Sequence, residues 1–116
     1  ESGLMIAQYS AAACCCELRT LAMPASVSNI STSGGIEDYN SMGATAGLLL
    51  RQSIDLCRTV VAIELMVGCD ALDHHRPLRS GDGVEAMYEK IRAVVPVRDC
   101  DRSPATDIKA IEGLLV

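Results

Sequence analysis

The sequence predicts an all-α protein in which one long helix is flanked by shorter helices. The middle of the chain has the pattern of a single extended helix, and no segment shows the two-residue alternation of a strand. Apolar residues make up 49% of the chain, yet aromatic residues make up only 3%, with no Phe and no Trp. Large aromatic side chains normally supply much of a core. This core must therefore be built from Leu, Ile, Val, Met and Ala, which suits close packing of helices.

The first helix is expected over residues 4–21, a segment rich in good helix formers such as Leu, Met, Ala and Glu. Pro24 stops it, because proline does not fit a helix interior. Residues 22–36 are rich in Ser, Asn and Gly and show no helical period. We expect an irregular loop there.

The long helix is expected over residues 37–75, and Pro77 ends it because the residue before a proline disfavours helical geometry. About 38 residues at about 1.5 Å each give a rod of about 57 Å. A globule of this size has a radius of gyration of only about 13 Å, so the rod must either kink or belong to a larger bundle. From residue 59 to residue 72 apolar residues surround the helix, which indicates burial and self-association. Glu64 and Asp70 lie too centrally in this stretch for a membrane span.

Two shorter helices are expected after the long one, over residues 84–95 and 107–115. The first is amphipathic, and its apolar stripe consists of Val84, Met87, Ile91 and Val94. Pro96 ends this helix, and a charged turn follows. Thr106 or Ser103 is expected to cap the last helix.

Length and charge restrict the class of protein. A chain of 116 residues is enough for one domain with a modest core. Its net charge of −5 argues against nucleic acid and anionic membranes as partners. The chain begins Glu1-Ser2-Gly3, without Met and without a charged-then-apolar leader, which argues against a secretory signal and against a native start. We therefore expect a cytoplasmic piece of a larger protein.

The six cysteines predict neither a disulfide framework nor a metal site. Those at positions 14–16 are adjacent, so on a helix they point about 100° apart and cannot clamp one ion. The other three stand alone, without C-x-x-C spacing: Cys57, Cys69 and Cys100. We expect the cysteines to act as small, buried hydrophobic residues in a protein of a reducing compartment. The alternative is that one of them is a reactive thiol.

Polar residues are expected at both ends of the long helix. Glu37 and Asp38 are expected at its N-terminus, where unpaired N–H groups and a partial positive charge favour carboxylates. They either cap the helix or place one carboxylate in a cleft, as a base or as a partner for a substrate nitrogen. His74 and His75 close the helix near its negative end, and Asp70 lies one turn before His74, at the spacing of an intrahelical pair.

Two further features are weaker candidates. Glu64 lies in an apolar stretch and, if buried, needs a partner such as Arg58 or a residue on another chain. Ser33-Gly34-Gly35 has the composition of a small anion-binding nest. Without a preceding strand or a Gly-Lys pair, it is a weak phosphate signal.

Several blocks of residues occur in a fixed order along the chain. They are Ser2-Gly3-Leu4-Met5-Ile6-Ala7-Gln8, Pro24-Ala25-Ser26-Val27, Glu37-Asp38 with Ser41-Met42-Gly43, Ala62-Ile63-Glu64-Leu65, and Ala71-Leu72-Asp73 followed by Arg76-Pro77-Leu78. Together they resemble the C-terminal segment of the histidine and aromatic amino-acid ammonia-lyases. The resemblance covers nearly the whole of residues 1–116, and several blocks in register are more specific than any one of them.

The resemblance implies an all-helical homotetramer whose central bundle contains the long helix. It also implies a methylidene-imidazolone prosthetic group, formed autocatalytically from an internal Ala-Ser-Gly, that lets ammonia leave an α-amino acid to give an unsaturated acid. That triad, and the Tyr that serves as base, belong to an N-terminal part of the same enzyme. Thr32-Ser33-Gly34 resembles a variant of the triad but falls in the wrong block, so we interpret it as loop.

The resemblance also assigns site residues. Glu37 matches the family's active-site carboxylate, which faces the imidazole or amine of the substrate, and Met5 matches a residue that lines the substrate side-chain pocket. Gly35 and Ile36 stand at substrate-contacting positions where many members have Asn-Gln. A carboxylate suits an imidazole better than a bare ring, so histidine is favoured over tyrosine or phenylalanine. Because the 116-residue chain lacks the electrophile, we expect it to be inactive on its own. Two alternative functions stay open: a non-catalytic oligomerisation module, or a segment of a related aminomutase.

Overall fold

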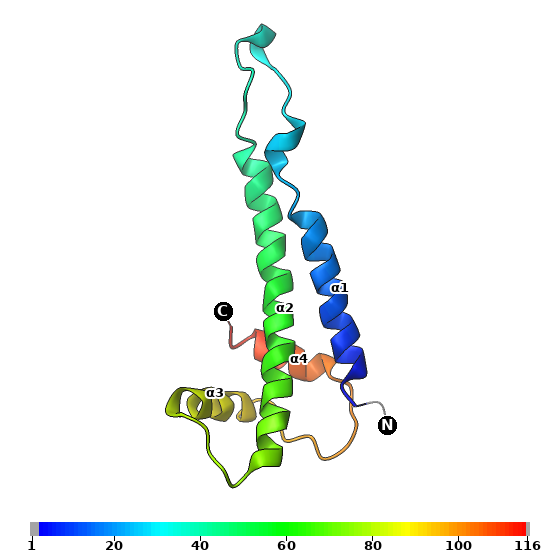
Figure 1. Ribbon diagram of the computed structural model, residues 1–116, viewed down its shortest axis with the longest axis vertical. Helices are drawn as coiled ribbons and strands as arrows, with labels where there is room; N and C mark the ends of the chain where they lie inside the picture. The colour runs from blue at the N-terminus through cyan, green and yellow to red at the C-terminus, as the bar shows by residue number, and fades with distance from the viewer. Residues whose placement is uncertain (1–2, 116) are drawn as a thin grey trace.

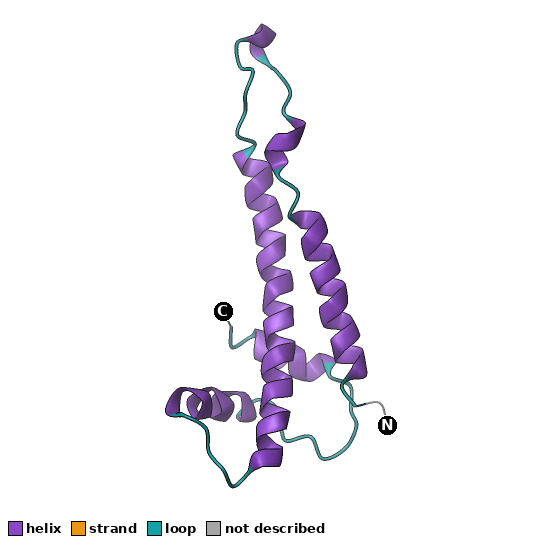
Figure 2. Cartoon of the chain, in the orientation of Figure 1, coloured by secondary structure: helices purple, strands orange, loops and turns teal. Residues whose placement is uncertain are grey.

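The computed structural model describes residues 3–115, which form an elongated body of 70 × 33 × 19 Å. Two helices lie side by side as a stalk, a loop closes one end of it, and two shorter helices lie across the other end (Figure 1). Within residues 3–115 the secondary structure is helical apart from one isolated bridge (Figure 2). The predicted all-α class is confirmed.

The stalk consists of α1 (Met5–Leu21) and α2 (Gly43–His75). Two short 3₁₀ turns separate them, η1 (Ala25–Ser28) and η2 (Ser33–Gly35). Helix α1 begins one residue after the expected start and ends at the expected residue. The 33 residues of α2 run on without a break, which makes a rod of about 50 Å.

The start of the long helix was predicted wrongly, since α2 begins at Gly43 rather than at residue 37. Glu37 is instead paired through its backbone with Thr32, and the backbone N–H of Asn40 is bonded to a side chain. Met42, directly before the helix, has a left-handed backbone with φ of 52°. Asn and Ser side chains that bond to nearby backbone groups compete with helix formation. Asp38 therefore does not cap α2.

The two helices at the base are α3 (Asp82–Arg92) and α4 (Ala105–Glu112). Each begins two residues and ends three residues earlier than its expected range. Acidic Asp82 and Glu85 lie in the first turn of α3, and basic Lys90 and Arg92 lie in its last turn, which matches the helix dipole. Helix α4 begins directly after Pro104 and has no side-chain cap, so neither predicted cap forms.

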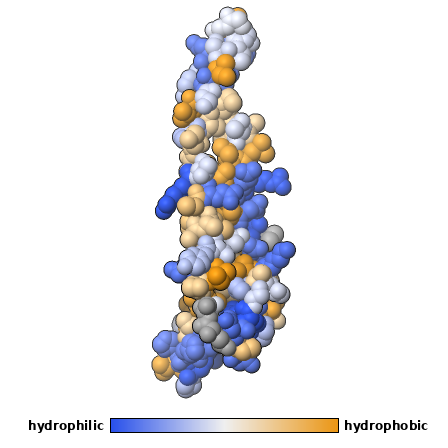
Figure 3. Space-filling model, turned by 90° about the vertical axis from the view of Figure 1, so that its right-hand side faces the viewer, coloured by the Kyte–Doolittle hydropathy of each residue, from blue (hydrophilic) through white to orange (hydrophobic). Residues whose placement is uncertain are grey.

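The core lies along one side of α2. Its buried members are Ala7 from α1, Ala62, Ile63, Met66 and Cys69 from α2, Ile91 from α3, Val95 shortly after α3, and Ile111 from α4. The other sides of α2 are exposed within this chain, including Val61 and Val67. Apolar surface is accordingly visible along the body (Figure 3). Within this chain the 59–72 segment is therefore buried on one side only, and not on every side as the sequence predicts.

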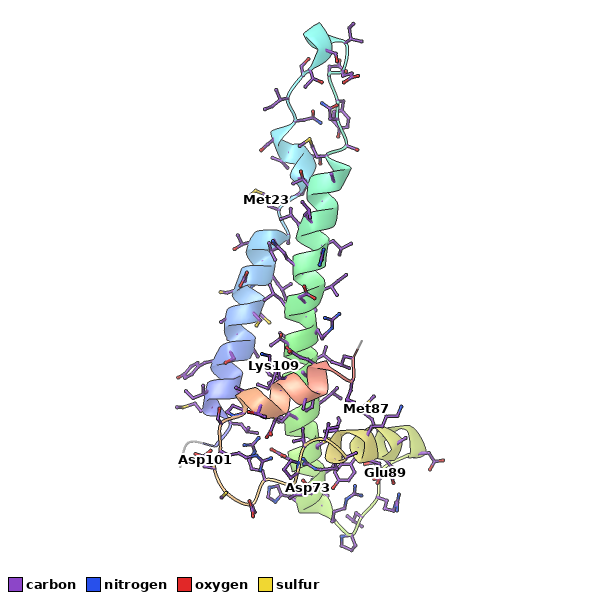
Figure 4. The ribbon with its side chains drawn as sticks, turned by 180° about the vertical axis from the view of Figure 1, so that it is seen from behind. Met23, Asp73, Met87, Glu89, Asp101 and Lys109 are labelled. Atoms are coloured by element: carbon purple, nitrogen blue, oxygen red, sulfur yellow. The ribbon has the colours of Figure 1, made fainter. Side chains whose placement is uncertain are left out.

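A network of ion pairs joins the base helices to α2, and sequence reasoning missed it. Asp70 and Asp73 of α2 accept hydrogen bonds from Arg92, and Asp73 also accepts one from Tyr88 (Figure 4 labels Asp73). Arg98 bridges Asp70 to Asp107 at the start of α4, with N···O distances of 3.0 and 3.2 Å. The predicted pairing of Asp70 with His74 is wrong, because the guanidinium groups of Arg92 and Arg98 bind the two oxygens of the Asp70 carboxylate.

Candidate active site

Glu37 lies in a loop of residues 29–40, called here the tip loop, at the end of the molecule farthest from α3 and α4 (Figure 1). Thr32 N–H donates to the Glu37 carbonyl at 2.9 Å, and Glu37 N–H donates to the Thr32 carbonyl at 3.3 Å. The Thr32 hydroxyl donates to Glu37 Oε2 at 3.2 Å. The Glu37 carboxylate is exposed, so it is available to a partner from outside these residues.

A second set of hydrogen bonds closes the base of the tip loop. Asn29 Oδ1 accepts from the Asn40 N–H at 3.0 Å, and Asn29 Nδ2 donates to the Asn40 carbonyl. Asn40 Nδ2 donates to the Ile30 carbonyl at 3.1 Å. One amide side chain thus binds both backbone groups of the residue opposite, as a neighbouring strand would.

Gly35 and Ile36 lie beside Glu37 on the same turn. Ser33, Gly34 and Gly35 all have positive φ, and the value of 90° at Gly35 is one that glycine adopts readily. Ile36 is 85% exposed, an apolar side chain that projects from a polar loop. The turn therefore leaves the side chains of Ile36 and Glu37 exposed at the end of the stalk.

Met5 is not near this turn. It is the first residue of α1, and with Leu4, Val60 and Val67 it lines an apolar groove between α1 and α2. The 17 residues of α1 alone span about 26 Å, and the tip loop lies beyond their far end. The structure therefore brings three of the predicted site residues together, but it leaves the fourth near the opposite end of the stalk.

The other candidate residues, the cysteines and Glu64, do not form a second site among residues 3–115. All six cysteines are free, and of these only Cys69 is buried, so the expectation of buried cysteines is wrong for the exposed ones. Burial raises the pKa of the Cys14 and Cys69 thiols, which disfavours the reactive thiolate. Glu64, expected in the interior with a partner, is exposed within this chain. Residues 3–115 hold no cluster of three or more metal-ligating side chains, and no helix among them is long and apolar enough to cross a membrane.

The chain's own residues do not fit the formation of a methylidene-imidazolone group. Residues 1–116 contain no Ala-Ser-Gly. The nearest sequence, Thr32-Ser33-Gly34, forms the exposed turn of the tip loop, and its Thr is already bonded to Glu37 through backbone and side chain. The segment predicted as loop thus contains the 3₁₀ turn η2.

Sequence reasoning missed Thr32, Asn29 and Asn40 as parts of this site. The pairs are five and eleven residues apart, and no helical or strand period connects them. Two Asn residues that flank a Ser- and Gly-rich run are the only signal in the sequence. That signal indicates a turn without telling which groups bond across it.

Comparison with known proteins identifies the class to which this helical stalk and tip loop belong. A family model described as aromatic amino acid lyase matches residues 1–93, well over half of the chain. The chain belongs to the aromatic amino acid lyase family.

Curated relatives and a solved structure narrow the resemblance further. A histidine ammonia-lyase from Stigmatella aurantiaca is 47% identical over 99% of this chain, and one from Deinococcus radiodurans is 45% identical over 100% of it. The crystal structure of histidine ammonia-lyase from Trypanosoma cruzi matches 99% of the chain with a TM-score of 0.91 and 36% identity. The chain spans 22% of the length of both relatives and 23% of the length of that crystallised chain.

Proposed function

We propose that this chain is the C-terminal helical part of an ammonia-lyase that removes ammonia from histidine to give an unsaturated acid. The observation that carries the proposal is the match to histidine ammonia-lyases over essentially the whole chain, at 45 to 47% identity and with the same fold. A match of this length includes the tip loop as well as the scaffold. The amino-acid substrate would bind where the tip loop meets the rest of the enzyme.

Glu37 is the residue of this chain that we propose to act on the substrate. Its carboxylate accepts a hydrogen bond from the imidazole N–H or the ammonium of the substrate and holds the amino acid in position. A charge-assisted hydrogen bond of this kind is roughly twice as strong as one between neutral groups. Ile36 and Gly35, at the positions where other members carry amides, would shape the space around the bound side chain.

The separation of Met5 from Glu37 supports a homo-oligomer. If both residues line active sites, as the resemblance implies, each site takes the tip loop of one protomer and the start of α1 from another. We propose a homotetramer in which α2 lies in the central bundle. Each active site is then completed by an N-terminal part of the enzyme as well.

An exposed seam along α2, called here the α2 seam, supports the same proposal. It lies on the side opposite the buried core and repeats at alternating spacings of four and three residues, typical of helices that pack against each other. Its members are all exposed: Leu50, Ile54, Cys57, Val61, Glu64, Gly68 and Ala71. Glu64 would find the partner predicted for it on another chain.

The electrophilic group is expected to come from outside these 116 residues, because none of them fits its formation. The isolated chain is therefore proposed to be inactive. Its six free cysteines are consistent with a reducing, cytoplasmic location. A non-catalytic oligomerisation module would share the stalk and the α2 seam, and an aminomutase would share the tip loop as well.

The test is an assay of the full-length gene product against histidine, tyrosine and phenylalanine, followed by the absorbance of the unsaturated acid. Glu37→Gln is expected to lower kcat/KM for histidine by about 10- to 150-fold, which corresponds to the loss of a hydrogen bond to a charged group. Asp38→Asn, a neighbouring exposed carboxylate, is the matched control and should leave kcat/KM nearly unchanged.

Three results would contradict the proposal. Activity on tyrosine alone would overturn the choice of substrate. A β-amino acid as the only product would identify an aminomutase. An inactive full-length protein that still forms a defined oligomer would favour the oligomerisation module.

A further inference from the structure

The tip loop is ordered by hydrogen bonds and not by packing. Every residue from 31 to 39 is exposed within this chain, so no core side chain holds the turn in place. Its order comes from the Asn29–Asn40 pair at its base and the Thr32–Glu37 pair nearer its end. Within residues 3–115, the hydrogen bonds that hold Glu37 all come from Thr32 of the same loop.

One group within the loop contacts the Glu37 carboxylate directly. The Thr32 hydroxyl donates to Glu37 Oε2 at 3.2 Å, while the backbones of the same two residues are joined in both directions. Among residues 3–115, no group donates a hydrogen bond to Oε1, the other carboxylate oxygen. A long, flexible glutamate side chain is thereby anchored at one oxygen and presents the other.

We propose that Thr32 is a positioning residue for Glu37, and that the Asn29–Asn40 pair fixes the loop from which both project. This inference rests on the proposed function, in which Glu37 binds the substrate. Thr32 orients the carboxylate so that its second oxygen meets the substrate nitrogen in a productive geometry. It does not touch the substrate itself.

The test uses the full-length enzyme with Thr32→Val, which keeps the shape of the side chain but removes the donor. A misplacement of about 1 Å can cost about 10²-fold in rate, so kcat should fall by about 10- to 100-fold, with a smaller change in KM. Thr32→Ser restores the hydroxyl and should recover most of the activity. Thr106→Val, at an exposed threonine on α4, is the matched control and should have wild-type kinetics.

A double-mutant cycle separates positioning from a general structural role. In a Glu37→Gln background Thr32→Val should cause little further loss, because the group that it orients is already gone. Thr32→Val with full activity, or with the same fractional loss in both backgrounds, overturns the inference and leaves the role of Glu37 intact. A Glu37→Gln enzyme with full activity overturns the role of Glu37 itself, and the inference with it.

Discussion

At the scale of single residues, the Asn29 side chain accounts for the closure of the tip loop. It binds both the N–H and the carbonyl of Asn40, and Asn40 in turn donates to the Ile30 carbonyl. Asn29→Ala removes both contacts at once. Two hydrogen bonds contribute about 1 to 3 kcal/mol to local stability, so amide exchange at Thr32, Glu37 and Asn40 should become at least about fivefold faster.

Hydrogen exchange of the 116-residue chain, measured by nuclear magnetic resonance, is the direct measurement. Ser28→Ala is the control, since Ser28 is an exposed neighbour whose side chain makes no hydrogen bond within residues 3–115. Unchanged protection at Asn40 in the Asn29→Ala chain would show that the loop does not depend on this amide pair.

Glu85 is expected to make the stability of the chain depend on pH. The hydrogen bond from Arg76 and then the N–H of Ser80, at 3.0 and 2.7 Å, hold the pKa of the Glu85 carboxyl below its ordinary value. A carboxyl with a lowered folded-state pKa contributes stability above its unfolded value of about 4.3. That contribution is lost as the pH falls through the folded-state pKa.

The lowered pKa of Glu85 predicts how the melting temperature changes with pH. The melting temperature of the wild-type chain should exceed that of Glu85→Gln at pH 6, and the difference should shrink as the pH is lowered from about 4. Glu89→Gln, at a carboxylate that is 70% exposed and 3.8 Å from Arg79, should show little difference at any pH. A constant gap between wild type and Glu85→Gln down to pH 2 would mean that folding does not lower the pKa of the Glu85 carboxyl.

At the scale of elements, the sequence was informative where a helix is bounded by proline or carries an apolar stripe. The ends of α1 and the end of α2 agree closely with expectation, because Pro24 and Pro77 act locally. The start of α2 was missed because the Asn29 side chain, eleven residues away, accepts a hydrogen bond from the backbone N–H of Asn40. In the predicted helix that N–H would have bonded to a helix carbonyl. The carboxylates at positions 37 and 38, which favour a helix N-terminus, did not indicate that competition.

The attachment of the base helices could not be predicted from the sequence. The Arg98–Asp70 contact joins residues 28 apart, and Arg92–Asp70 joins residues 22 apart, so neither has a helical spacing. The sequence instead suggested the local Asp70–His74 pair. For the candidate site, Glu37 and its neighbours were assigned by resemblance, whereas Thr32, Asn29 and Asn40, which bond within the loop, become visible only in the structure.

Arg98 is expected to be the main electrostatic link between α2 and α4. Its guanidinium reaches Asp70 and the buried Asp107, and its side chain is 12% exposed. Arg98→Met keeps the length of the side chain but leaves both carboxylates short of a partner. Removing one partner from a buried ion pair costs about 3 to 5 kcal/mol. Because Arg92 and Arg102 remain, the free energy of unfolding should fall by about 3 kcal/mol, the lower end of that range.

Urea denaturation followed by circular dichroism measures this loss. Arg19→Met, at an exposed arginine on α1, should change the free energy of unfolding by less than about 0.5 kcal/mol. Equal stability of the Arg98→Met chain and the wild type would show that the remaining arginines satisfy both carboxylates.

At the scale of the whole molecule, the shape supports the proposal that the chain functions in an assembly. Its radius of gyration is 20.0 Å, against about 13 Å for a compact domain of similar length. The core occupies one side of α2 near the base, while the upper stalk has little within the chain to cover it. An elongated body of this kind leaves apolar surface exposed along its length, as Figure 3 shows. Such surface usually marks a protein–protein contact.

We expect the 116-residue chain to self-associate through the α2 seam. Ile54 and Val61 are about half-exposed members of that seam, so Ile54→Asp with Val61→Asp places two charges on the contact without entering the core. Burying these unpaired carboxylates against a partner helix is costly, and the mass measured by light scattering at tens of micromolar should fall towards that of one chain. Gln52→Asp adds a charge to the same helix outside the seam and should leave the mass unchanged. A wild-type chain that is already a folded monomer at this concentration would contradict the prediction, since the exposed seam would then be stable in water.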